Sequence, residues 1–130
     1  MSCSNCGGDT VAFPVEEALR EYLPDGTVGV SLCRSCLSMD PVDDPPEAVP
    51  DLTVLGDSFP SNPAAAVPMA LLVGLLDSLA LNRPEITALL ERVERAGTDP
   101  LLVVDRLDDA YGDDAFVDLG ARRHQLAQLL

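Results

Sequence analysis

Hydrophobic residues in the second half of the chain recur at the three- and four-residue spacing of helices. Asn62 followed by Pro63 is typical of a helix start, and we predict a helix from there to near Asn82. This segment is apolar on nearly all sides, so we expect it to be the central helix, covered by the others. Prolines interrupt its uncharged stretch and leave 13 apolar residues, 64–76, which is short for a bilayer span and suits a buried helix.

Three shorter helices are predicted to follow the central one. The sequence 82–85 (Asn-Arg-Pro-Glu) has the spacing of a capping box, and the helix that it opens should end at Gly97. The next helix is expected from Thr98 to Gly112, and residues 113–114 should begin the last one. Four short helices with tight connections indicate a small bundle.

The first 40 residues have a different pattern, typical of short strands. Residues 11–15 and 28–32 are short runs rich in valine, and residues 16–22 between them fit one or two helical turns. We therefore predict a small β module over residues 1–40.

Residues 41–62 carry 5 of the 11 prolines, 5 acidic residues and no arginine. This composition predicts an extended linker, in which residues 52–55 or Phe59 could still dock on a neighbouring element. The expected fold is thus α+β, with a β module (1–40), a linker (41–62) and a helical domain (63–130).

Two C-x-x-C pairs, Cys3/Cys6 and Cys33/Cys36, are the strongest chemical signal in the chain. A tetrahedral zinc ion takes four thiolates, and each C-x-x-C turn places two sulfurs on one side of the ion. Glycines follow the first pair, where they tolerate the left-handed backbone of such a turn, but Leu37 follows the second. The four cysteines are therefore predicted to bind one structural zinc ion, with the longer than usual spacing between the pairs accommodated as an insertion.

These cysteine pairs resemble those of zinc ribbons, and the whole chain resembles small haloarchaeal C-x-x-C proteins of families of unknown function. The resemblance implies a zinc-bearing β module and supplies no activity. A rubredoxin-like iron centre uses the same pairs, but that family packs several aromatics around its iron, and only Phe13 and Tyr22 lie in this region. Disulfide or dithiol redox chemistry is the third alternative, which a reducing cytoplasm disfavours.

The charge of the chain bears on its solvent and its partners. There are 22 acidic residues against 8 basic ones, for a net charge of -14, and every basic residue is arginine. Such a charge favours expansion in dilute salt and is screened at molar ionic strength, where the Debye length is about 3 Å. The excess of aspartate and the absence of lysine resemble haloarchaeal proteins, so we expect a salt-adapted cytoplasmic protein. The N-terminal residues show no export signal.

The expected function is non-enzymatic, because four cysteine ligands leave a zinc ion no open position for substrate. His124, the single histidine, has no nucleophile nearby in the sequence. A nucleic-acid-associated or transcription-related zinc ribbon is the alternative, although residues 1–40 carry 2 arginines against 6 acidic residues. Residues 64–81 offer more apolar surface than three short helices need, so we expect a protein partner or a homodimer through the helical domain.

Overall fold

An antiparallel sheet of three strands forms the N-terminal part of the computed structural model, which describes residues 2–23 and 26–130. Strand β1 (Thr10–Pro14) pairs with β2 (Gly29–Cys33), and helix α1 (Glu17–Arg20) lies between them in the sequence. These elements confirm the predicted strands within one residue. Strand β3 (Met39–Pro41) was not predicted, because it is three residues long and has no apolar run; it pairs with the free edge of β2.

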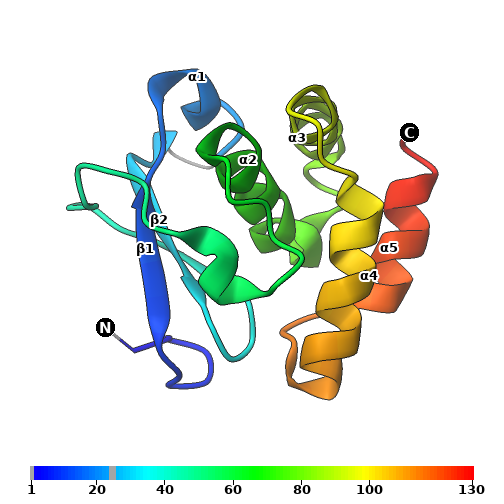
Figure 1. Cartoon of the computed structure of the whole chain (residues 1–130), viewed down its shortest axis with the longest axis horizontal. Coiled ribbons are helices and arrows are strands. Elements are labelled where there is room, and N and C mark those ends of the chain that lie inside the picture. Colours follow the sequence, from blue (N-terminus) through cyan, green and yellow to red (C-terminus); the bar gives the residue numbers. More distant parts are fainter. Residues whose placement is uncertain (1, 24–25) are drawn as a thin grey trace.

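Helix α2 (Pro63–Gly74) is the central helix, as predicted, and lies between the sheet and the remaining helices (Figure 1). Asn62 begins it, since its side-chain oxygen accepts a hydrogen bond from the amide of Ala64 at 3.1 Å. Helix α3 (Arg83–Arg95) packs on α2, and α4 (Pro100–Tyr111) packs on α5 (Leu119–Ala127). The α+β class and the helical C-terminal part are therefore confirmed.

The end of the central helix differs from the prediction. Helix α2 stops at Gly74, and a 3₁₀ turn, η3 (Leu76–Ser78), follows in place of a helix reaching Asn82. Glycine is a poor helix former, and here it also admits a close neighbour: a β-carbon added to Gly74 would lie 2.5 Å from the sulfur of Met39. The break thus lets strand β3 pack closely against the helix.

Helix α3 begins directly after Asn82, as predicted, but the predicted capping box is absent, and the predicted start of the last helix is wrong. Asn82 makes no capping hydrogen bond; its side-chain amide donates instead to the carbonyl and hydroxyl oxygens of Ser78, at 3.1 and 2.8 Å. The last helix begins at Leu119 rather than at residues 113–114, because Gly112–Asp114 form a 3₁₀ turn, η4. Asp118 caps α5, accepting from the amide of Ala121 at 3.0 Å.

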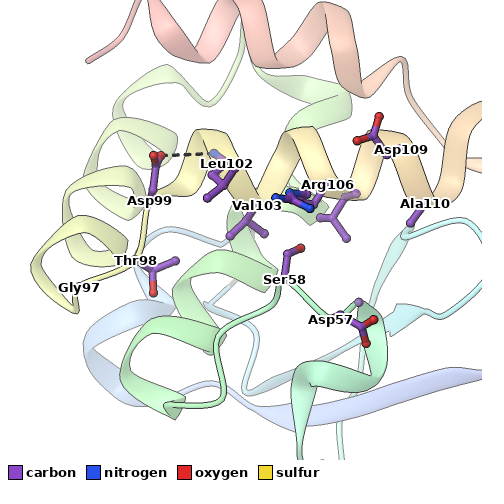
Figure 2. A pocket seen from close by; sticks show the side chains of 12 residues that line it. Asp57, Ser58, Gly97, Thr98, Asp99, Leu102, Val103, Arg106, Asp109 and Ala110 are labelled. Carbon is purple, nitrogen blue, oxygen red and sulfur yellow. Dashed lines mark hydrogen bonds between the residues drawn. The ribbon is translucent and has the colours of Figure 1, made fainter.

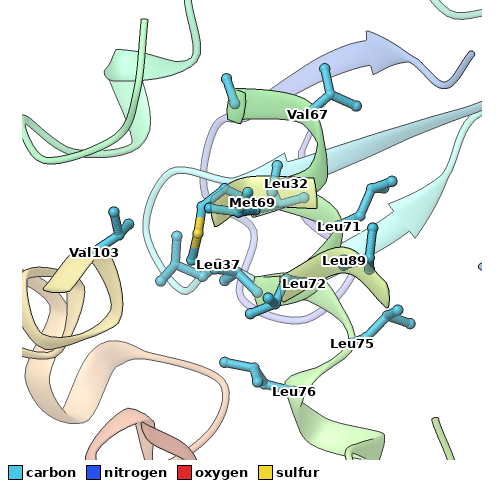
Figure 3. Close-up of a cluster of buried hydrophobic side chains, with 14 of the residues drawn as sticks. Leu32, Leu37, Val67, Met69, Leu71, Leu72, Leu75, Leu76, Leu89 and Val103 are labelled. Carbon is cyan, nitrogen blue, oxygen red and sulfur yellow. The ribbon is translucent and has the colours of Figure 1, made fainter. Parts of the chain in front are cut away.

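One hydrophobic core includes side chains from residues 1–40, 41–62 and 63–130, the three regions that differ in composition. Residues 41–62 contribute to it, because Leu52 and Leu55 of the 3₁₀ turn η2 (Leu52–Leu55) and Phe59 are buried. Residues 52–59 therefore dock on the body of the protein, as the sequence allowed, whereas most of residues 41–48 are exposed. Figure 3 shows part of this core, where Leu32 of the sheet and Leu37 lie among side chains of α2 and α3.

The chain covers the apolar surface of residues 64–81 itself. The core side chains between Val67 and Leu79 are each at most 5% exposed. Beyond them, Leu81 is 85% exposed. The sheet of the N-terminal module and the other helices thus cover this segment, so an expected partner has to use another surface. None of the helices in the described part of the chain combines the length and the apolar character that crossing a bilayer requires.

Candidate metal centre

The two cysteine pairs form turns with the same backbone hydrogen bonds. In each turn the residue after the pair, Gly7 or Leu37, donates its amide to the carbonyl of the first cysteine at 2.9 Å. The amide of the first cysteine donates to the carbonyl of the second residue after the pair. Cys3 thus bonds to Gly8 at 2.8 Å, and Cys33 bonds to Ser38 at 3.0 Å. Gly7 and Leu37 both have a left-handed backbone, with φ of 78° and 70°. The turns are therefore structurally equivalent although their sequences differ.

The sheet brings the two turns together. The first turn precedes β1 and the second follows β2, and the antiparallel register places Thr10 opposite Cys33, so both turns lie at one end of the strand pair. The amide of Arg34 extends the pairing by donating to the carbonyl of Asp9 at 2.7 Å. The pairing of β1 with β2 fixes the relative position of the turns whatever the length of the segment that connects the strands. This explains how the wide spacing of the cysteine pairs is accommodated.

The four sulfurs form a compact cluster that fits a tetrahedral metal ion. Cys3, Cys6, Cys33 and Cys36 have ligand atoms that all lie within 4.8 Å of one another. The sulfurs of Cys6 and Cys33 are 3.4 Å apart, and those of Cys3 and Cys36 are 3.7 Å apart. Zinc–sulfur bonds of about 2.3 Å in a tetrahedron put the sulfurs about 3.8 Å apart. No disulfide joins them.

Hydrogen-bond donors surround three of the sulfurs. The hydroxyl of Ser38 lies 3.0 Å from the sulfur of Cys3 and 3.1 Å from that of Cys36. Asn5 contacts the same two sulfurs, with its amide 3.3 Å from Cys3 and its side-chain nitrogen 3.6 Å from Cys36. The sulfur of Cys33 faces two backbone amides, those of Ser35 at 3.2 Å and Cys36 at 3.4 Å. Such contacts stabilise thiolates and orient metal ligands.

The thiols titrate unequally. Burial raises the pKa of Cys3, but hydrogen bonds from Ser38 and from nearby backbone outweigh it and lower that pKa to about 6. Burial also raises the pKa of Cys36, but hydrogen bonds from Ser38 outweigh it, so this pKa is lowered as well. At Cys6 the backbone of Gly8 lowers the pKa, but the thiols of Cys33 and Cys36 outweigh this effect and raise it to about 12. A bound cation would remove the remaining protons, so metal affinity must fall as the pH falls.

The helical region also contacts the centre. The amide of Phe116 donates to the carbonyl of Cys36 at 2.8 Å, and its side chain packs against the three buried cysteines. Tyr111 at the end of α4 donates its hydroxyl to the carbonyl of Leu55 at 2.5 Å. Sequence analysis assigned neither residue to the site, and the one signal for Phe116 was an aromatic residue in an acidic turn. The contacts of Phe116 couple the cysteine turns to the helical region, and the hydrogen bond of Tyr111 joins α4 to the turn η2.

Two further sites bear on function. The side chain of His124 is exposed on α5, and it has no hydrogen bond or ion pair to any other described residue. A hollow of about 700 Å³ lies between residues 56–58 and α4 (Figure 2). Arg106 and three aspartates line it, and neither histidine nor cysteine is present among the described residues of its lining. Asp99 in this lining caps α4, accepting from the amide of Leu102 at 3.3 Å.

No curated protein and no solved structure matches the chain. Residues 2–130 match the sequence model of the family of unknown function DUF6276, to which the chain therefore belongs.

Proposed function

We propose that Cys3, Cys6, Cys33 and Cys36 bind one zinc ion as a structural centre, and that the protein is not an enzyme. The observation that carries this proposal is the cluster of four sulfurs within 4.8 Å of one another. Zinc binds such all-cysteine sets in structural sites, whereas catalytic zinc keeps a position for water or substrate. Four thiolates leave no such position.

The ion has a clear structural task in this fold. It would tie the turn before β1 to the turn after β2, and Phe116 would link that joint to the helices. Binding of a structural zinc ion typically contributes about 10–16 kcal/mol of apparent free energy, which is as large as the stability of a whole domain. Because one core runs through the chain, loss of the ion should destabilise the helices as well as the sheet.

The function of the folded protein is proposed to be binding of a protein partner, in the cytoplasm. The exposed apolar side chains on the helical side are Leu81, Leu102 and Leu130, at 85%, 49% and 56%. Leu102 lies at the hollow beside α4 and is the best candidate for a contact residue. Light scattering in molar salt tests for a second copy, and Leu102→Asp should weaken any complex that uses this surface.

Elemental analysis tests the metal proposal. Protein purified without added metal should contain about one equivalent of zinc. Cys33→Ser should lose the metal, whereas Ser35→Ala should keep it, because Ser35 contributes its backbone amide and not its side chain. Metal-free protein with two disulfides would refute the proposal. Visible absorption with iron in place of zinc would favour the rubredoxin-like redox function instead.

A further inference from the structure

The four cysteines differ in how far solvent can reach them. Cys6 is exposed, whereas Cys3, Cys33 and Cys36 are buried. Cys6 also lines a hollow of about 710 Å³ between the two cysteine turns and the C-terminal end of α4, where Arg34 and Tyr111 are among its neighbours. Small molecules can therefore approach the centre at one corner of the tetrahedron.

The sulfurs also differ in their hydrogen bonds. Two donors lie within hydrogen-bond distance of each buried sulfur, supplied by Asn5, Ser38 and the backbone of the second turn. Among residues 2–23 and 26–130, the backbone of Gly8 is the one donor to the sulfur of Cys6 apart from the neighbouring thiols, which a bound zinc ion would deprotonate. A hydrogen bond withdraws electron density from a thiolate and makes it less nucleophilic. Cys6 thus combines the best access with the least hydrogen bonding.

We propose that Cys6 is the reactive sulfur of the metal centre and a modification site for small, uncharged carbon electrophiles. The proposal rests on the proposed zinc centre, which keeps all four sulfurs as thiolates. In the reaction the Cys6 sulfur forms a bond to the electrophilic carbon, and the leaving group departs with its electron pair as an anion. The thiolate becomes a neutral thioether, which is a weaker ligand, and the three buried sulfurs keep their places around the ion.

Uncharged electrophiles are specified because of the local charge. A zinc ion with four thiolates carries two negative charges, and the chain as a whole carries -14. An anionic reagent is repelled by this field, most strongly in dilute salt. Arg34 and Asp114, which also line the hollow, offset each other's charge.

Peptide mapping of the zinc-loaded protein tests the proposal. With iodoacetamide below one equivalent, the first adduct should form on Cys6, about tenfold faster than on any other cysteine. Ser38→Ala removes a donor from two buried sulfurs, so the rate advantage of Cys6 over Cys3 and Cys36 should narrow in that variant, with Cys6 still the first to react. Cys6→Ser should lose the fast adduct, and the wild-type map decides the matter if this variant does not fold.

Three results would overturn the proposal: adducts spread evenly over the four cysteines, a first adduct on a buried one, or no adduct on loaded protein. Zinc content is measured on the same sample before the reagent is added. A sample without zinc would refute the proposed metal centre, and a zinc-loaded sample with the wrong adduct would refute the role of Cys6 alone.

Discussion

Leu37 provides a direct test of how backbone strain and packing compete in the second cysteine turn. It is the one non-glycine residue with a left-handed backbone in the described part of the chain, and its φ is 70°. Its side chain is 0% exposed and belongs to the main hydrophobic core. Glycine at this position would remove the strain and also remove the buried side chain.

The packing effect should win. Truncating a buried leucine to alanine costs about 3–5 kcal/mol. Replacing alanine by glycine removes the remaining methyl group and raises the conformational entropy of the unfolded chain, which together cost about 1 kcal/mol more. Relief of the left-handed strain returns about 1–2 kcal/mol. Leu37→Gly should therefore lower the free energy of unfolding by about 2–5 kcal/mol, although glycine is the residue that this turn conformation prefers.

Gly7, the equivalent position in the first cysteine turn, allows the effect of backbone strain to be measured without a change in packing. Gly7 has a φ of 78°, is exposed, and would have no atom within 4 Å of an added β-carbon. Gly7→Ala should therefore cost only the strain, about 1 kcal/mol after the lower entropy of the unfolded chain is subtracted. Urea denaturation of all variants at the same metal and salt concentrations measures both effects. A Leu37→Gly protein as stable as the wild type would refute the packing argument.

Three further predictions follow from single contacts. Gly74→Ala should destabilise the protein by about 1–3 kcal/mol, because its β-carbon would clash with Met39, and Met39→Ala in the same chain should recover part of the loss in a double-mutant denaturation experiment. Tyr111→Phe should cost about 1–2 kcal/mol by leaving the carbonyl of Leu55 without its donor; an unchanged urea midpoint would show that water replaces the hydroxyl. Lowering salt from molar to about 0.1 M should reduce helical circular dichroism, because the screening length grows from about 3 to about 10 Å; equal signals at both ends would refute the salt-adapted interpretation.

The parts of the fold that the sequence predicts are those with strong local signals. Asn62, Asp99 and the glycines at 97 and 112 lie where helices begin or end, because capping and chain reversal depend on neighbouring residues. The cysteine pairs were legible for the same reason, since each turn is closed by hydrogen bonds within six residues. Local chemistry sufficed there.

The features that the sequence did not predict depend on contacts between distant residues. The early end of α2 reflects the close approach of Met39, which lies 35 positions before Gly74. The sequence allowed residues 52–55 or Phe59 to dock on a neighbouring element, but the surface on which they dock is set by distant parts of the chain. The contact of Phe116 with the cysteines joins residues 80 positions apart. None of these pairings leaves a periodic signal in the chain.

The placement of charge separates the effect of salt from that of the proposed metal. Ser31 is the single buried polar residue besides the cysteines among those that the structure describes, so the main hydrophobic core contains no charged side chain. Two ion pairs are found among the described residues, Arg95–Glu91 and Arg123–Asp105. Their side chains are at least 39% exposed, so they contribute little to the free energy of unfolding. Repulsion between surface carboxylates must therefore be balanced by ions from the solvent. A zinc ion at the proposed centre would be held by four sulfurs, three of them buried. Salt does not weaken zinc–sulfur bonds, so removal of the metal should lower stability at every salt concentration.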